Sequence, residues 1–361
     1  MVSVGQLLIE MPKSYEELCY QEKAIVRKRG IQSPADLIML ALFHLLNGCS
    51  LIEISTIASL TKLGNISDVA FMKRFENCSN WFMQIISELV CSGEVIYAKP
   101  EWLETYRVVA VDASDVKEKG RSGRIYRLHY ALNLFNMESL QYKITTQKTG
   151  ESLCNFTVSA GDIMIADRAY SSYAGVEHCL NCGGDFILRL KKTCFKMRDA
   201  HSQEVKLLEE LRVLEEGGVM DNHVIIRNST GKDFTLRVCA VRKTPEGIEQ
   251  TQKKLRRKES KRKMIISEDT KEFNDYIVLI TSLPDGISAQ QIMDLYRLRW
   301  QVEIYFKRLK SIMDFGELPK RRHESVMAWL NGKMMVALLI ENIVNKAVFP
   351  PGSECDEEYL A

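Results

Sequence analysis

The chain has 361 residues, of which 46% are hydrophobic and 27% are charged. These proportions are typical of a soluble globular protein, and the length allows two or three domains. The formal net charge is only +2, so any basic surface that binds nucleic acid must be local. No apolar run reaches the ~20 residues that span a bilayer, so we expect no membrane partner. The ten cysteines show no repeated spacing, which favours a reducing cytoplasm over a disulfide framework.

The first segment, residues 1–98, is expected to form an all-helical domain. Ser33 and Pro34 mark a helix start, because serine caps a helix N-terminus and proline fits its first turn. Further helices are predicted at 50–62 and 68–78. Two helices with a short glycine-containing connection can form a DNA-binding helix-turn-helix, but spacing alone favours a plain helical bundle.

After Pro100 the chain contains short apolar runs that are typical of buried strands. The run YRVVAVD ends in Asp112, and the later run DIMIAD ends in Asp167. Around them the sequence predicts strands at 130–135, 141–146 and 185–190 and helices at 151–159 and 172–181. Residues 99–190 therefore form the first part of a predicted α/β domain.

Residues 191–285 are expected to form an inserted, β-rich subdomain. Apolar runs within it predict strands at 223–228, 234–241 and 276–283. It also carries the segment Lys253–Lys263, in which eight of eleven residues are basic. This basic run is either a solvated charged helix or a grip on DNA phosphates. The candidate phosphate contacts within it are Lys253, Lys254, Arg256 and Arg257.

A long helix is predicted at 289–314. Ser288 followed by Gln291 is a capping-box pattern, which marks its start. The helix contains the stretch YRLRWQVEIYFKRLK at 296–310, which mixes aromatic residues, cations and one carboxylate. We expect this helix to belong to the second part of the α/β domain, at 286–348.

One narrow stripe of this helix carries a carboxylate among cations. At about 100° per residue, Arg299, Glu303 and Lys310 all fall within about 60° of Tyr296. An ordinary surface helix with an Arg299–Glu303 ion pair would explain the stripe. A face that meets an anionic polymer and a metal ion would explain it equally well.

The two strand-terminal aspartates favour the second explanation. If their strands are neighbours in one sheet, Asp112 and Asp167 meet at the same edge, and a helix across the sheet can present Glu303 there. Three carboxylates are hard oxygen ligands that suit Mg²⁺ or Mn²⁺. We therefore predict a shared metal site formed by these three residues.

The spacing from Tyr296 through Arg299 and Glu303 to Lys310 matches the Y-R-E-K signature without a gap. In this feature the chain resembles the IS-four family of insertion-sequence transposases. The blocks VDAS and GDIMIADRAY, which contain the two aspartates, also look like blocks of that family. The resemblance implies a DDE catalytic domain of ribonuclease-H-like fold, a mixed sheet flanked by helices, interrupted by the insertion and preceded by the helical domain.

The resemblance also implies a function. Such a protein binds the terminal inverted repeats of an insertion sequence, cleaves the DNA and joins the 3′-OH ends to target DNA, working as a homodimer on double-stranded DNA. Cleavage of this kind uses two Mg²⁺ or Mn²⁺ ions about 3.5–4 Å apart. Asp112 would bridge the ions, with Asp167 on one and Glu303 on the other. We expect a cytoplasmic protein held on the nucleoid through DNA.

Further residues near the carboxylates are candidate DNA contacts. They are Tyr296, Arg299, Lys310, Trp300, Arg168 and Tyr170. Arg299 and Lys310 would bind phosphates near the cleaved bond. Trp300 either stacks on an exposed base or is partly buried. Arg168 equally suits an ion pair with a carboxylate.

Two alternative functions remain open from the sequence. One is a metal-dependent, ribonuclease-H-like DNA nuclease without strand transfer. The other is a catalytically inactive, shortened transposase-derived DNA-binding protein. In either case the chain would keep the expected boundaries, with residues 349–361 forming a tail.

Overall fold

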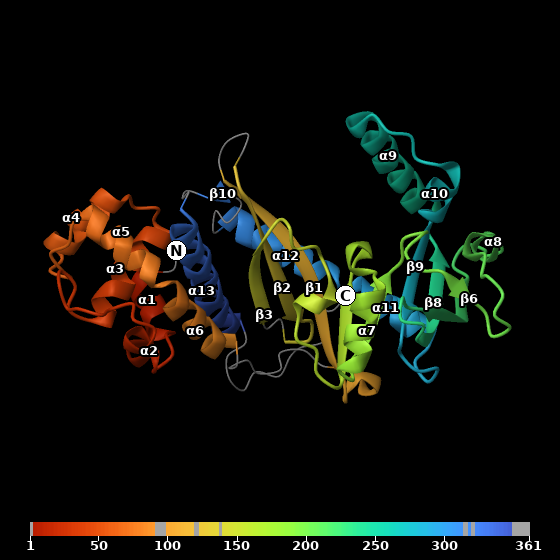
Figure 1. Ribbon diagram of the computed structural model, residues 1–361, viewed down its shortest axis with the longest axis horizontal. Helices are drawn as coiled ribbons and strands as arrows, with labels where there is room; N and C mark the ends of the chain where they lie inside the picture. Colours follow the sequence, from red (N-terminus) through yellow and green to blue (C-terminus); the bar gives the residue numbers. More distant parts are fainter. Residues whose placement is uncertain are drawn as a thin grey trace.

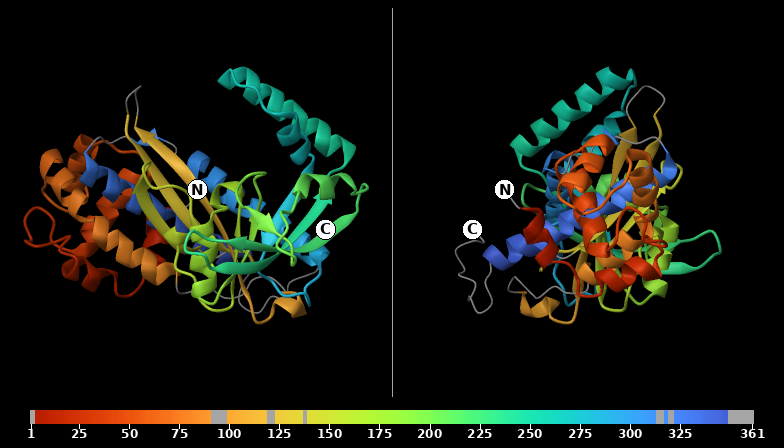
Figure 2. Two further views of the ribbon diagram at one scale, coloured as in Figure 1. Left: turned by 45° about the vertical axis from the view of Figure 1, so that its right-hand side comes forward. Right: turned by 90° about the vertical axis from the view of Figure 1, so that its left-hand side faces the viewer.

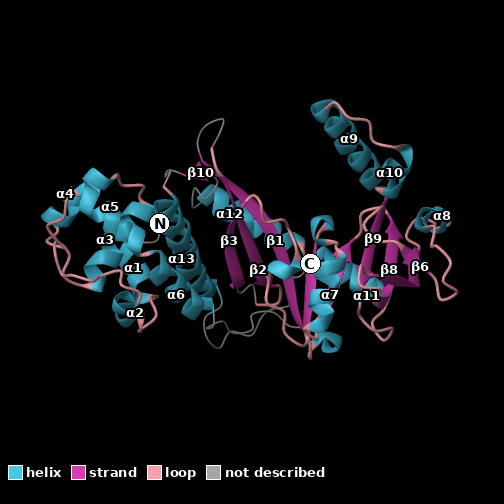
Figure 3. Cartoon of the chain, in the orientation of Figure 1, coloured by secondary structure: helices cyan, strands magenta, loops and turns pink. Residues whose placement is uncertain are grey.

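The computed structural model describes residues 3–90, 99–118, 123–136, 139–312, 317–318 and 322–348. The molecule is elongated (Figure 1): a helical part occupies one end, a long twisted sheet runs through the middle, and the insertion lies at the other end. Helices dominate the first part, and strands dominate the rest (Figure 3).

The N-terminal part is helical, as predicted. The bounds of its helices are α1 Val4–Ile9, α2 Tyr15–Gln21, α3 Pro34–Leu46, α4 Leu51–Leu60, α5 Asp68–Asn77 and α6 Ser79–Val90. The hydroxyl of Ser33 accepts the backbone N–H of Asp36, so the predicted start of α3 is confirmed. The hydroxyl of Ser67 accepts the backbone N–H of Ala70 and caps α5 in the same way.

The last described helix, α13 (His323–Val348), completes this helical part. It runs beside α3, α5 and α6 (Figure 1). Gly332 permits the close approach, because a Cβ atom there would lie 2.6 Å from a methyl carbon of Leu45. The side-chain amide of Asn331 donates to the hydroxyl of Ser79 at 2.9 Å. The helical domain therefore contains residues from both halves of the chain, which the expected boundaries did not include.

By length and composition α13 would also pass as a membrane span. Its segment His323–Val344 has a mean hydropathy of 1.2, yet 72% of this apolar segment is buried inside the protein. Burial of this extent is what the core helix of a helical bundle shows.

Five strands form the first half of the sheet, from the edge strand β3 to β5. Their bounds are β1 Arg107–Glu118, β2 Ile125–Asn133, β3 Ser139–Thr146, β4 Asp162–Ala166 and β5 Asp185–Arg189. They lie in the order β3-β2-β1-β4-β5. Strand β2 is antiparallel to β1 and β3, whereas β4 is parallel to β1 and β5. This is the strand order of a ribonuclease-H-like domain, so the predicted fold class is confirmed. A short strand, β10 (Glu317–Leu318), pairs with the far end of β1.

Two predicted elements of this region are wrong in extent. Strand β1 does not end at Asp112, because it goes on pairing with β2 as far as Lys117. The helix predicted at 151–159 is only a 3-10 helix of three residues, η2 (Leu153–Asn155). Beyond it the backbone N–H and carbonyl of Thr157 are both bonded by the side chain of Gln141 in β3, which holds this segment extended. The helix predicted at 172–181 is confirmed as α7 (Tyr173–Asn181).

The insertion extends the same sheet. Its strands, β6 Met197–Arg198, β7 Val219–Arg227, β8 Asp233–Arg242 and β9 Tyr276–Thr281, continue from β5 in the order β9-β8-β7-β6. It also contains the helices α8 Leu207–Arg212, α9 Pro245–Arg262 and α10 Glu268–Phe273. The insertion is therefore mixed rather than simply β-rich. Helix α9 carries the basic run and stands away from the sheet (Figure 2).

The sheet separates two apolar cores, because successive strand residues point to opposite faces. Ala110 and Ile165 belong to the first core, whereas Val111 and Ala166 belong to the second. The helices α11 (Ala289–Arg297) and α12 (Trp300–Ile312) contribute buried side chains to the first core. Asp112 of β1 therefore points to the same face of the sheet as Ala110, which is the face that α11 and α12 cover.

The helix predicted at 289–314 is in fact two helices. The capping box of Ser288 is confirmed at the start of α11. At the junction the backbone bonds shorten to i→i−3: Arg299 donates to Tyr296 at 3.1 Å, and Val302 donates to Arg299 at 3.2 Å. These shorter bonds separate α11 from α12. Tyr296 therefore lies on α11 and Glu303 on α12, and the predicted straight stripe is broken. Gly316, near the expected end, lies outside the described residues.

Candidate active site

Asp112 and Asp167 lie at corresponding positions of two neighbouring parallel chain segments. The register of β1 and β4 pairs Ala110 with Ile165, and each aspartate follows two residues later. Adjacent strands are about 4.8 Å apart, so the two backbones are close at this level. From the sequence we predicted that the two strands are neighbours and that both aspartates lie at the same edge of the sheet. The register of β1 and β4 agrees with this prediction for the two backbones.

The next strand adds a residue that the sequence analysis missed. The register of β4 and β5 pairs Ala166 with Leu188, which places Arg189 beside Asp167. Asp112, Asp167 and Arg189 thus form one row across three strands, on the face of the first core. Arg189 ends a buried strand just as Asp167 follows one, and this shared position is the signal that could have found it.

Asp112 is largely buried, and its surroundings disfavour its charge. One carboxylate oxygen accepts the backbone N–H of Ala113 at 2.8 Å. The pKa of Asp112 is raised to about 6, mainly by burial and also by the negative charges of Asp167 and Glu303, against the opposing effects of the Ala113 hydrogen bond and of Arg299. These electrostatic effects mean that all three neighbours lie near Asp112.

Asp167 has a structural role as well as a candidate catalytic one. It is the N-cap of the 3-10 helix η3 (Arg168–Tyr170), and its carboxylate accepts the backbone N–H of Ala169 at 2.7 Å. The cap fixes the carboxylate at the end of β4. A further carboxylate lies nearby, because the charge of Asp167 helps burial to raise the pKa of Glu151. No pattern in the sequence singled out Glu151.

Glu303 is held by the arginine of the same motif. Arg299 donates to Glu303 at 2.5 Å, so the ion pair considered from the sequence is present. The arginine is mostly buried, whereas 57% of the Glu303 side chain is exposed. The guanidinium carbon of Arg299 lies 5.7 Å from the ring centroid of Tyr296, which is itself buried. Tyr296 therefore supports Arg299 from beneath and has little surface of its own.

The remaining candidate DNA contacts divide into exposed and buried residues. Lys310 and Trp300 are exposed on α12. Tyr170 is fully buried in the second core, so a direct contact with DNA is wrong for this conformation. Arg168 donates to the side-chain oxygen of Asn274 and forms no ion pair in the described chain. Burial and the nearby Arg189 lower the pKa of Arg168 to about 10.

The chemistry of the donor set fits a divalent metal, but the donors do not yet form a ligand cluster. Asp112, Asp167 and Glu303 offer only hard oxygen atoms. Among the described residues, no group of three or more His, Cys, Asp or Glu side chains is arranged to hold a metal ion. The bond to Arg299 accounts for the position of Glu303. Convergence of the three carboxylates therefore stays a prediction.

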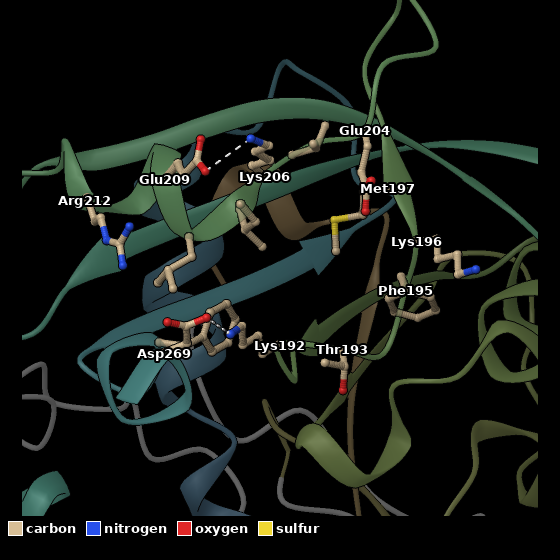
Figure 4. Close-up of a pocket in the computed structure, with 14 residues that line it drawn as sticks. Lys192, Thr193, Phe195, Lys196, Met197, Glu204, Lys206, Glu209, Arg212 and Asp269 are labelled. Carbon is tan, nitrogen blue, oxygen red and sulfur yellow. Dashed lines mark hydrogen bonds and ion pairs between the residues drawn. The ribbon is translucent and has the colours of Figure 1, made fainter. Parts of the chain in front are cut away.

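A cavity of about 460 Å³ lies elsewhere, in the insertion (Figure 4). Apolar side chains such as Phe195 and Phe273 line it, and the ion pair between Lys192 and Asp269 lies at its edge. None of the three candidate catalytic carboxylates lines this cavity.

Comparison with known proteins identifies the family. A family model described as a transposase DDE domain matches residues 103–339, which include both aspartates and the Y-R-E-K motif. The chain belongs to the DDE transposase family. DDE transposase domains generally use divalent metal ions and act on DNA.

Two named transposases are similar to this chain over most of its length. It is 29% identical over 358 residues to the transposase for insertion sequence element IS421 of Escherichia coli, covering 97% of this chain and 96% of that one. It is 24% identical over 323 residues to the transposase for element IS231E of Bacillus thuringiensis subsp. finitimus, covering 80% and 65%. The resemblance to the IS-four family is thereby confirmed. A likeness to the catalytic domain of human endonuclease V, at 12% identity and a TM-score of 0.20, adds nothing to the fold assignment, which rests on the strand order.

Proposed function

We propose that this transposase binds the terminal inverted repeats of an insertion sequence, cleaves the DNA there and joins the freed 3′-OH ends to target DNA. The observation that carries the proposal is the row formed by Asp112 and Asp167 on neighbouring strands, with the Glu303 helix on the same face of the sheet. This arrangement occurs within a chain of the DDE transposase family.

Asp112, Asp167 and Glu303 are the residues that would hold the metal, which we propose to be two Mg²⁺ or Mn²⁺ ions. When bound, such ions activate the attacking oxygen and neutralise charge on the phosphate. The raised pKa of Asp112 supports this role, because it reflects a buried carboxyl group with two further carboxylates near it, whose charges Arg299 only partly offsets. Strain of this kind is common where a site is built for a ligand rather than for stability.

Arg299 is proposed to change partners when DNA binds. In the free protein its guanidinium neutralises Glu303, and Tyr296 limits its movement. A DNA phosphodiester carries one negative charge, as the Glu303 carboxylate does, and it can accept two parallel bonds from the same planar donor group, so it can replace Glu303 as the partner. Transfer of Arg299 to a phosphate would release Glu303 toward Asp112 and Asp167.

Other side chains on the same face suit contacts with the DNA backbone. Arg189 lies beside Asp167 in the row, and Lys310 is exposed on α12. Both are proposed to hold phosphates flanking the cleaved bond. Trp300 has 53% of its surface exposed, which suits stacking on an unpaired base.

The basic run on α9 is proposed to grip phosphates without reading bases. None of the side chains of α9 is buried, and its lysines and arginines point into solvent. In the described chain, no ion pair joins any of its eight cations to a carboxylate. A cationic helix that no protein surface covers is suited to a polyanion.

The assembly and location follow from the same proposal. Two element ends must be held together for joint insertion, so we propose a homodimer on the DNA. We propose a cytoplasmic protein that stays on the nucleoid through DNA. The helical domain would be formed by 1–98 together with α13, the catalytic domain by 99–190 and the Y-R-E-K helices of 286–348, and the insertion by 191–285.

The deciding experiment is a product assay with Mg²⁺, a labelled duplex ending in the element's inverted repeat, and a supercoiled target plasmid. The expected products are duplexes cut at the repeat and then joined to the plasmid through their 3′ ends. Cut ends that never join the plasmid would instead establish a nuclease without strand transfer. Binding without any cut, in Mg²⁺ or Mn²⁺, would establish an inactive DNA-binding protein.

A further inference from the structure

The most exposed apolar side chain of the insertion lies directly beside its most basic segment. Ile265 has 92% of its surface exposed, and its neighbour Met264 has 43% exposed. Both follow the last residues of α9, where Lys261, Arg262 and Lys263 are exposed cations. A single exposed isoleucine is ordinary on a protein surface, so the case for a binding role here rests on its position beside these three exposed cations.

The turn after α9 fixes the direction of Ile265. Lys263 takes a left-handed conformation with φ of 50°, and this ends the helix. Glu259 then ties the returning chain: its carbonyl accepts the N–H of Met264 at 3.2 Å, and its carboxylate accepts the N–H of Ile266 at 2.8 Å. Ile266 is buried, so Ile265, the residue between two fixed neighbours, is directed outward.

Among the described residues, no carboxylate forms an ion pair with the cations of this basic segment. Glu259 is the only carboxylate within Lys253–Lys263, and it bonds to Ile266 and to Lys271, the latter at 3.4 Å. A second bond holds α9 to the rest of the insertion at Gln252, whose side-chain amide donates to Asp275 at 2.6 Å. The helix is thus a fixed arm that stands away from the sheet (Figure 2). Its outer part carries exposed cations, and the exposed side chains of Met264 and Ile265 follow its end.

We propose that Ile265, with Met264 beside it, is a wedge that inserts between base pairs of double-stranded DNA while the cations of α9 hold the flanking phosphates. Proteins that bend DNA use isoleucine, methionine or leucine side chains in this way, partly unstacking one base step and kinking the duplex. The positive charge of α9 favours a polyanion as the partner. The apolar side chains at its end favour a polyanion whose stacked bases can separate, as those of double-stranded DNA can. The inference rests on the proposed function and adds a bending step to it.

The test compares Ile265→Ser with Val213→Ser, a matched control. Val213 is another exposed apolar residue of the insertion, with 82% of its surface exposed, and it lies outside the basic segment. Bending is measured as the end-to-end distance of a doubly labelled duplex by fluorescence transfer, and affinity is measured on straight duplex and on duplex carrying a mismatch bulge. Thermal melting checks that each variant is folded, which is expected because neither side chain is buried.

Wild type and Val213→Ser should shorten the end-to-end distance of bound duplex equally, and Ile265→Ser should not. Affinity of Ile265→Ser should fall about 5–10-fold on straight duplex and much less on the bulged duplex, whose base step is already open. The salt dependence of binding should stay unchanged, because the phosphate contacts remain.

Equal bending by wild type and Ile265→Ser would overturn the wedge. So would a flatter salt dependence of Ile265→Ser, which would mean that the substitution disturbs phosphate contacts instead. Loss of binding to vesicles of phosphatidylserine and phosphatidylcholine with unchanged bending would assign the tip to a membrane surface. Loss of a DNA-free oligomer seen by light scattering would assign it to a second copy of the chain. Wild type that binds no duplex at all would refute the proposed function itself.

Discussion

The rings of Tyr130 and Tyr305 stack in parallel, with their centroids 4.5 Å apart and an interplanar angle of 9°. Tyr130 lies directly opposite Asp112 in the ladder between β1 and β2, and Tyr305 lies two residues from Glu303 on α12. Both tyrosines are buried. The stack therefore joins the strand of one candidate catalytic carboxylate to the helix of another.

Replacing Tyr305 by leucine should weaken cleavage more than DNA binding. Leucine fills part of the space but loses the flat contact that fixes α12, so Glu303 would be held less closely to Asp112. Misplacement of a catalytic group by about 1 Å can cost about 100-fold in rate. Cleavage rate and DNA affinity should be measured well below the melting temperature of the variant. Tyr305→Phe, which keeps the ring, is the control and should retain most of the rate; equal losses in both variants would refute a role for the stack.

Glu303→Gln should abolish Mg²⁺-dependent cleavage and leave DNA binding largely intact. Glutamine keeps the shape of the side chain but lacks the charge that holds a divalent ion. It also weakens the hold on Arg299, so affinity for DNA should not fall. Cleavage and gel-shift assays on the same element-end duplex provide the measurement, with Glu324→Gln, an exposed glutamate of α13, as the control. Undiminished cleavage would remove Glu303 from the mechanism.

Asp112→Asn should stabilise the metal-free protein at neutral pH while abolishing cleavage. Folding raises the pKa of Asp112 from 3.8 to about 6, so the folded state favours the protonated form. Above pH 6 the carboxyl is ionised in both states, and its full cost to stability, about 1–3 kcal/mol, is present. As the pH falls through 6 toward 3.8 the folded-state carboxyl becomes protonated, and the cost disappears.

The check is the unfolding free energy of wild type and Asp112→Asn between pH 4 and pH 8 with a chelator present. The advantage of the variant should be largest at pH 8 and shrink toward pH 4. An advantage that does not change with pH would mean that the asparagine acts through packing or hydrogen bonding rather than through charge.

Replacing Lys253, Lys254, Arg256 and Arg257 by alanine should flatten the salt dependence of DNA binding. All four side chains are exposed on α9, but a helix spreads them around its axis, so two or three can meet one duplex. Each lost phosphate contact removes about 0.9 from the slope of log affinity against log salt, so the slope should fall by roughly 2–3 units.

The salt titration of this variant is run on element-end DNA and on unrelated DNA. The loss should be similar on both, because phosphates carry no sequence information. An unchanged slope would make the basic run of α9 an ordinary solvated helix. A loss confined to element-end DNA would mean that these residues read bases.

The sequence alone determined the features that depend on local chemistry. The capping residues Ser33 and Ser288 start their helices as predicted, because a cap needs only a side-chain oxygen and a nearby N–H group. The apolar runs that end near Asp112 and Asp167 are strands, because burial on both faces requires unbroken apolar side chains. The spacing of the Y-R-E-K motif, combined with the blocks VDAS and GDIMIADRAY, sufficed to indicate the family.

Only the tertiary structure decided which side chains meet. The register of three strands put Arg189 beside Asp167, and packing buried Tyr170 in a core that its position in the sequence did not reveal. Helix α13 joined the N-terminal helices, because its apolar surface needed partners that the intervening chain did not supply. The turn at Arg299 broke a helix that periodicity alone predicted as continuous. Such contacts join residues far apart in the chain, and a sequence pattern records the local preference of each residue but not its eventual neighbour.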